Sequence, residues 1–268
     1  MRILYAIGLS VALLSCTHTA SGRGKLLPGY DADHQYYFHR TYIPDNSVQL
    51  GFSAGYSLYR ATLTRQEDFR NGPNLTPAAS LLHVGLLGEK GFLNMRLTVA
   101  TGVYYSQLNS FLSGGWPSYK GAAYVVDHED DLTVHYTSVN DVRSVASYVS
   151  VPVEVTFALV NDTDYGLYLK GSAKANVNLY ATTKFITGVS TTEEVKQRLT
   201  SYFESVDPFF VNAHLKVGFR WGSFDTPNFR LEAGIPFKLS KSNTTYYQMN
   251  MGITAQIALY IPLFIFYG

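Results

Sequence analysis

Two long segments of strict apolar–polar alternation place the strongest constraint on how this chain can fold. Within Ser147–Tyr180, apolar residues hold the odd positions from Val149 to Leu159 and again, apart from Gly171, from Tyr165 to Leu179, and mostly polar or small residues hold the even ones. A period of two residues indicates a β-strand with one apolar and one polar face. Each segment is roughly twice as long as an ordinary strand and is long enough to cross a bilayer at a tilt.

Six further segments with the same alternation lie between Val48 and the C-terminus, at residues 48–58, 78–87, 93–106, 209–221, 229–239 and 247–259. The second is the least regular, because Leu81 and Leu87 fall on its polar face. Short connections at residues 88–91, 161–164 and 222–228 alternate with longer ones, the longest at 110–146. This alternation is the pattern of outer-membrane barrels, with short turns on the periplasmic side.

The segments therefore predict an all-β fold, an eight-stranded antiparallel up-and-down transmembrane β-barrel over residues 48–268. An even number of strands places both ends of the barrel on the periplasmic side. A soluble barrel with an apolar interior has the same sequence period. The length of the strands, the small residues on their polar faces and the N-terminal segment favour the membrane.

Composition agrees with a surface that faces lipid. Charged residues make up only 15% of the chain and aromatic residues another 15%, whereas a typical soluble domain is about 25% charged. Abundant Tyr and Phe suit the aromatic girdles of membrane barrels. The 21 Lys and Arg nearly balance the 20 Asp and Glu, so net charge gives no reason to expect nucleic acid as a partner.

Residues 1–15 predict a signal peptide, because an apolar run from Ile3 to Leu14 follows a positive charge and is too short to span a bilayer as a helix. The segment Leu13–Cys16 resembles a bacterial lipobox, in which the peptide is cut before a lipid-modified cysteine. Cleavage after Ala20 is the alternative. We expect Cys16, the only cysteine, to be the first mature residue and the lipid attachment site, followed by a periplasmic linker over residues 16–47.

The polar faces of the predicted strands carry charged residues that should point into the lumen. These are Arg96, Glu154, Lys170, Lys174, His214, Lys216, Arg220, Arg230, Glu232 and Lys238. Side chains fill the interior of an eight-stranded barrel, and unpaired buried charge is costly. We therefore expect Glu154 and Glu232 to pair with nearby cations in a charged plug. A basic lumen that attracts an anion is the alternative, because cations are in excess.

Some eight-stranded outer-membrane barrels modify lipid A with a His/Ser pair near the rim, which raises a catalytic alternative. His83 and His214 lie in predicted strands, and Ser80 and Ser172 are possible partners. Their spacing shows no triad, and the position of His83 in the least regular strand favours a register error over catalysis. The sequence predicts no catalytic residue, no metal site and no cofactor.

Three short motifs resemble the PorT-like outer membrane protein β-barrel family of Bacteroidetes-type bacteria. Tyr148–Glu154 is similar to that family's aromatic-apolar-x-Ile/Val-Pro segment, Gly102–Gln107 to its Tyr-Ser-Gln near the third strand, and Tyr168–Gly171 to its next, glycine-bearing strand. The lipobox is a departure, because members mostly have ordinary signal peptides. The resemblance covers Val48 to the end and implies an outer-membrane barrel but no single activity; some members serve protein secretion or gliding machinery.

These patterns together predict a non-enzymatic outer-membrane β-barrel that acts as a structural or accessory component of an envelope or secretion-type complex. We expect outer-membrane lipid and at least one envelope protein as partners, and no nucleic acid. A pore for small solutes or anions is one alternative, and a lipid A-modifying enzyme is another.

Overall fold

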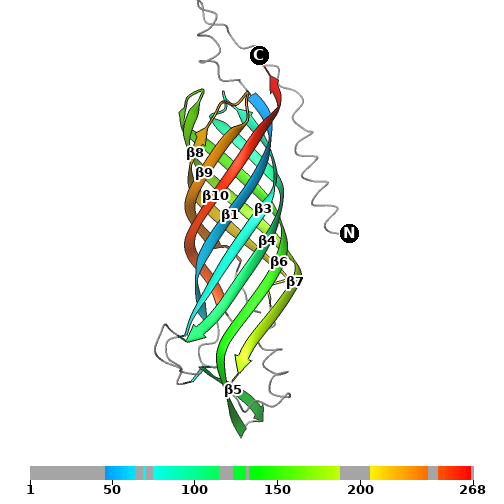
Figure 1. Ribbon diagram of the computed structural model, residues 1–268, viewed down its shortest axis with the longest axis vertical. Coiled ribbons are helices and arrows are strands. Elements are labelled where there is room, and N and C mark those ends of the chain that lie inside the picture. Colours follow the sequence, from blue (N-terminus) through cyan, green and yellow to red (C-terminus); the bar gives the residue numbers. More distant parts are fainter. Residues whose placement is uncertain are drawn as a thin grey trace, which may run out of the picture.

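In the computed structural model, antiparallel strands form a closed ring (Figure 1). The structure describes residues 46–63, 69–70, 75–114, 123–130, 133–187, 206–240 and 247–266. The ring consists of β1 (Asn46–Leu63), β3 (Leu75–Phe92), β4 (Leu97–Gly114), β6 (Thr133–Asn161), β7 (Tyr165–Thr187), β8 (Phe209–Trp221), β9 (Asn228–Lys238) and β10 (Tyr247–Phe266). Pairing of β1 with β10 closes it. The predicted eight-stranded antiparallel barrel is confirmed. No helix in the described part of the chain is long and apolar enough to cross a membrane.

Alternation along each strand sorts the side chains between an outer wall and an interior. On β8, Leu215 and Val217 are 59% and 51% exposed, whereas Lys216 between them is 1% exposed. The alternation is unbroken along β8 and nearly so along β9. Because successive side chains of a strand point to opposite faces, the period-two sequence builds an apolar wall around a polar interior.

The turn between β3 and β4 differs from the prediction. It lies at residues 93–96, not at 88–91, and Leu93, Asn94 and Met95 form it with φ angles of 53°, 54° and 59°. Non-glycine residues rarely adopt this left-handed conformation, so the sequence favours a turn at Gly88 and Gly91. Gly91 instead leaves room for Met95, whose sulfur would lie 1.9 Å from an added Cβ.

Strands on the long-connection side reach much further than predicted. β6 has 29 residues and β7 has 23, and β5 (Ala123–Asp130) and β2 (Phe69–Arg70) add to the free edge of β6. This extension, the sheet of β2, β5 and the first part of β6, projects beyond the ring in Figure 1. Most of the predicted loop at 110–146 is thus strand. Its sequence lacks apolar alternation because a strand that leaves the lipid no longer needs an apolar face.

The first residues of β10 face the opposite way from the prediction. Continuing the alternation of the predicted strand at 247–259 from the outward Ile257 back to its start puts Tyr247 and Met249 on the outer wall, but both are buried inside the ring. The β1–β10 register shifts between Tyr59 and Ala61, and a β-bulge of this kind reverses the faces of the residues beyond it.

The interior contains apolar as well as polar layers. On the long-connection side an apolar cluster packs across the ring. It comprises Tyr59, Ala61, Ala79, Leu81, Leu108, Val142, Ala146, Tyr148, Phe210, Tyr247 and Met249. A second cluster contains Leu87, Tyr104, Ala258 and Tyr260. The two leucines that make the second predicted strand irregular are therefore interior packing residues.

Candidate functional site: the filled interior and the outer wall

Four neighbouring strands each contribute one charge to the centre of the barrel. Lys170 of β7 donates to Glu154 of β6 at 3.1 Å and also pairs with Glu232 of β9. Lys216 of β8 lies 3.0 Å from the other oxygen of Glu232 and donates to Gln256. None of these charged side chains is exposed. Burying a charged group costs roughly several kcal/mol of desolvation free energy per ion. The ion pairs here offset that cost.

A further ion pair, separate from this central group, joins two strands on different sides of the ring. Both terminal nitrogens of Arg230 on β9 lie 2.7 Å from the carboxylate oxygens of Glu89 on β3. The guanidinium also donates to Gln49 at 3.0 Å and lies 3.7 Å from the centre of the Tyr260 ring. Planar, two-pronged pairing of this kind is the strongest geometry for an arginine and a carboxylate.

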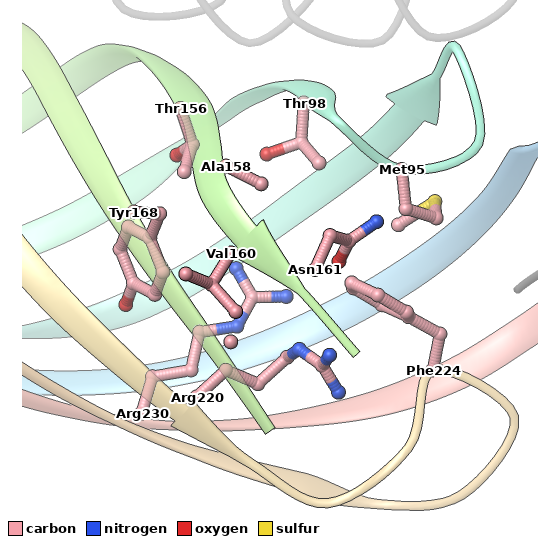
Figure 2. A pocket seen from close by; sticks show the side chains of 11 residues that line it. Met95, Thr98, Thr156, Ala158, Val160, Asn161, Tyr168, Arg220, Phe224 and Arg230 are labelled. Carbon is pink, nitrogen blue, oxygen red and sulfur yellow. The ribbon is translucent and has the colours of Figure 1, made fainter. Parts of the chain in front are cut away.

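The short-turn end of the interior is closed by Arg220 of β8 (Figure 2). Its guanidinium donates to the backbone carbonyls of Thr163 and Tyr165 at 3.1 and 3.0 Å, and to those of Asp162 and Gly222. It lies 3.9 Å from the centre of the Phe224 ring. Between these residues and Arg230 is a cavity of about 20 Å³, which has room for a single water molecule. Arg220 thus joins two turns and closes this end.

One buried lysine has no hydrogen-bond partner in the described part of the chain. Lys174 is 1% exposed, and its ammonium has no hydrogen-bond partner among the described residues; it lies 4.3 Å from the centre of the Tyr104 ring. His83 and His214 are also buried, with ring centres 6.3 Å apart. The Nε2 atom of His83 lies 3.2 Å from Oε1 of Gln256, and the Nε2 atom of His214 lies 2.8 Å from Nδ2 of Asn212. Within the described residues, no carboxylate is hydrogen-bonded to Lys174, His83 or His214.

The structure places nearly all of the predicted lumen charges inside the ring. Glu154, Lys170, Lys174, His214, Lys216, Arg220, Arg230 and Glu232 are buried, and Lys238 pairs with Asp207. Arg96 is the exception, because it lies in the β3–β4 turn and is exposed. Glu89 was not predicted as a lumen charge, because residues 88–91 were assigned to a connection. The turn lies at 93–96 instead, which leaves Glu89 on β3. His83 was attributed to a register error, but it faces the interior. Cys16 and the linker lie outside the described residues.

No Ser–His pair of the catalytic kind is formed by the predicted candidates. Ser172 and His214 are directly opposite across β7 and β8, but the Ser172 hydroxyl has no hydrogen-bond partner in the described part of the chain. Ser80 faces away from His83, because the two are an odd number of positions apart on β3. Both histidines lie deep inside the barrel rather than at a rim. Within the described ranges, no group of three or more His, Cys, Asp or Glu could hold a metal ion.

The outer wall decides the class of protein. Large apolar side chains are exposed on every strand of the ring, among them Phe52, Leu86, Val103, Phe157, Leu169, Leu215, Leu231 and Ile257, while lysines and glutamates are buried inside. A soluble barrel has the reverse arrangement, and only lipid makes such a wall stable. The chain is an outer-membrane β-barrel.

Comparison with known proteins gives this barrel structural neighbours but no sequence relatives. No family model and no curated protein matches the sequence. The crystal structure of Neisserial surface protein A aligns with a TM-score of 0.41 and 10% identity, over 81% of this chain and 97% of that one. The outer membrane protein OprG from Pseudomonas aeruginosa aligns with a TM-score of 0.34 and 8% identity, over 83% and 98%. The transport unit of the autotransporter AIDA-I from Escherichia coli gives 0.26 and 7%, over 96% of both chains.

Proposed function

We propose that this outer-membrane barrel is non-enzymatic and acts as a structural or accessory component of an envelope complex. The observation that carries the proposal is the filled interior: Arg220 and Phe224 close one end, ion pairs occupy the centre, and the apolar cluster of Tyr148 and Phe210 fills the other half. An interior packed in this way leaves the outer surfaces to make functional contacts. The resemblance to the PorT-like family is consistent with such a role and stays a prediction.

The extension supports the same proposal from outside the ring. β5 pairs with β6 from Ala123↔Val139 onward, whereas the ring pairing of β4 with β6 ends at Ser113↔Asp141. The extension therefore adds nothing to closure of the ring. A strand pair that projects beyond the membrane-spanning part offers backbone edges to a partner protein.

Conductance in planar bilayers tests the sealed interior against the pore alternative. We expect full-length protein at high loading to leave the bilayer sealed, while an open porin in the same bilayers gives current steps. Reproducible steps from the wild-type protein would overturn the proposal in favour of a pore. Lipid A from cells with and without the protein should have the same mass, and a mass change would favour an enzyme.

Recovery of partners from gently solubilised membranes tests the accessory role. Replacing residues 115–138 with a two-residue Asn-Gly turn should leave the ring folded, seen as heat-dependent migration in gels, but remove the co-purifying envelope protein. Replacing residues 241–245, which connect β9 to β10 in the sequence, with Gly and Ser is the matched control, and it should retain the partner. Recovery of monomer alone from the wild type would contradict the proposal.

A further inference from the structure

Three buried polar groups without hydrogen-bond partners lie side by side on the inner wall of the barrel. Ser172 and Lys174 occupy successive inward positions of β7, and Ser172 is directly opposite His214 of β8. All three side chains are buried. The Lys174 ammonium, the Ser172 hydroxyl and Nδ1 of His214 have no hydrogen-bond partner among the described residues. Opposite and diagonal positions of an antiparallel ladder are within reach of each other's side chains, so the three groups share one patch of the wall.

The hydrogen bonds around Asn212 make Nδ1 of His214 a donor. Asn176 donates through Nδ2 to the backbone carbonyls of Lys174 and Phe210, both at 3.1 Å. The same nitrogen lies 2.9 Å from Oδ1 of Asn212, so Asn212 turns its own Nδ2 toward Nε2 of His214, at 2.8 Å. Because that ring nitrogen accepts, the proton of the neutral imidazole lies on Nδ1. This N–H, the ammonium and the hydroxyl are three donors and together form the donor patch.

Lys174 gives the donor patch one positive charge. The ion-paired group beside it contains two lysines and two carboxylates, which are Lys170, Lys216, Glu154 and Glu232. That group is neutral in itself, and no carboxylate of the described residues is hydrogen-bonded to the Lys174 ammonium. A buried charge without a partner is costly. The donor patch therefore favours a ligand with a single negative charge.

Side chains enclose the donor patch along the axis of the barrel. Toward the long connections lie Tyr148 and Phe210 of the apolar cluster, both fully buried, with ring centres 5.0 Å apart. Toward the short turns lies the buried Lys170–Glu154 pair. The ring of Tyr104 on β4 has its centre 4.3 Å from the Lys174 ammonium. Because side chains fill the interior of an eight-stranded barrel, a ligand enclosed here must be small.

We propose that the donor patch binds one small monovalent anion of the size of chloride. The anion accepts hydrogen bonds from the Lys174 ammonium, the Ser172 hydroxyl and the Nδ1–H of His214. A water molecule would satisfy the same donors but would leave the charge of Lys174 uncompensated, whereas an anion compensates it through a charge-assisted hydrogen bond. The proposal concerns the interior of the barrel and does not depend on the proposed envelope complex.

Urea titration in nonionic detergent, with chloride exchanged for gluconate at constant ionic strength, tests the site. Gluconate has the same charge but is too large for a patch enclosed in this way. An anion that binds only the folded barrel stabilises it by mass action. A tenfold rise in chloride above the dissociation constant should therefore raise the folding equilibrium constant about tenfold for one site. A folding equilibrium that does not respond to chloride would overturn the proposal and leave water as the partner of the donors.

Two lysine variants separate binding at the donor patch from general effects of salt. Lys174→Met removes the ammonium with little change in side-chain length and should abolish the response to chloride. Lys184→Met, the same change at an exposed position of β7, should retain it. In gluconate Lys174→Met should be more stable than the wild type, and chloride should narrow that difference. An equal response in all three proteins would mean that the anion acts elsewhere and would overturn the site.

A carboxylate built into the wall is the complementary test. Asn212 is directly opposite Lys174, so Asn212→Asp places a negative charge of nearly the same shape beside the ammonium and should remove the response to chloride. An undiminished response in this variant would contradict the charge argument. Crystals of wild-type protein refolded in bromide should give an anomalous scattering peak within hydrogen-bond distance of Lys174 and His214. Bromide peaks confined to the outer surface would overturn the proposal.

Discussion

Two lysines on the same face of β7 differ in how their charge is compensated. Lys170 lies between Glu154 and Glu232, whereas the Lys174 ammonium has no hydrogen-bond partner among the described residues and lies over the face of the Tyr104 ring. Burial is nearly complete for both. At the residue scale, therefore, partners rather than burial decide whether a charge in this interior stabilises the barrel.

Substitution of the two lysines by methionine should have opposite effects. Lys170→Met leaves two carboxylates without their shared cation and should lower the free energy of unfolding by about 3–5 kcal/mol. Lys174→Met removes an unsatisfied buried donor and should raise it by about 1–3 kcal/mol. Urea titration of the refolded protein in detergent, followed by tryptophan fluorescence, measures both. A loss of stability in Lys174→Met similar to that in Lys170→Met would show that Lys174 has a partner.

The turn between β6 and β7 contains a carboxylate whose contribution depends on pH. Asp162 accepts hydrogen bonds from the backbone N–H of Thr163 at 2.6 Å and from its hydroxyl at 3.1 Å. These bonds, the backbone one first, hold the pKa of Asp162 below its ordinary value of 3.8. A lowered pKa means that the stabilisation is present above the ordinary value and is lost as pH falls through the lowered one.

We therefore expect Asp162→Ala to lower the thermal midpoint slightly at neutral pH, with the difference shrinking once the pH falls below about 4. Asp162→Asn is the control, because an amide oxygen still accepts both hydrogen bonds but does not titrate. Thermal melts across the pH range measure the midpoint. A gap between wild type and Asp162→Ala that stays constant well below pH 4 would contradict this account.

At the scale of the strand, small residues on the inner face make room for large ones across the ladder. Gly218 of β8 is buried opposite Tyr168 of β7, and an added Cβ would lie 2.2 Å from the Tyr168 ring. Gly218→Ala should therefore destabilise the barrel by about 1–3 kcal/mol, the range for overpacking.

Gly171→Ala on β7 is the matched control for Gly218→Ala. Gly171 faces outward, and an added Cβ would meet nothing within 4 Å. Because glycine weakens a strand, Gly171→Ala should leave the free energy of unfolding of the barrel unchanged or slightly higher. Urea titration of both variants gives the comparison, and equal effects would mean that strand propensity, not packing against Tyr168, determines the result.

Strand faces could be predicted from the sequence wherever one side meets lipid, as from Ser147 to Tyr180. The prediction failed where a local feature changes the register or the surroundings. Met249 faces inward because of a bulge that leaves no mark in the alternation, and the extension of β6 lacks an apolar face. Pairing of Lys238 with Asp207 could not be predicted, since Asp207 belongs to no strand and lies 31 positions before Lys238 in the sequence.

At the scale of the whole molecule, strand pairing in the ring does not depend on where the chain begins and ends. Asn46 of β1 and Phe266 of β10 are pairing partners at the short-turn end, so a short linker can join them. A permutant with this linker and new ends between Asp162 and Asp164 should form the same ring, because each strand keeps both neighbours. New ends between Gly218 and Phe219, within β8, should prevent folding. Heat-dependent gel migration and circular dichroism distinguish the outcomes.

The ion pairs inside the barrel also imply an order in which its strands assemble. Glu154, Lys170, Lys216 and Glu232 lie on consecutive strands, so their ion pairs can form as soon as β6 to β9 are side by side. The Arg230–Glu89 pair joins β9 to β3, which are brought close only when the ring closes. An unclosed intermediate would thus hold part of its charge already neutralised, and the Arg230–Glu89 contact would report the moment at which the sheet becomes a barrel.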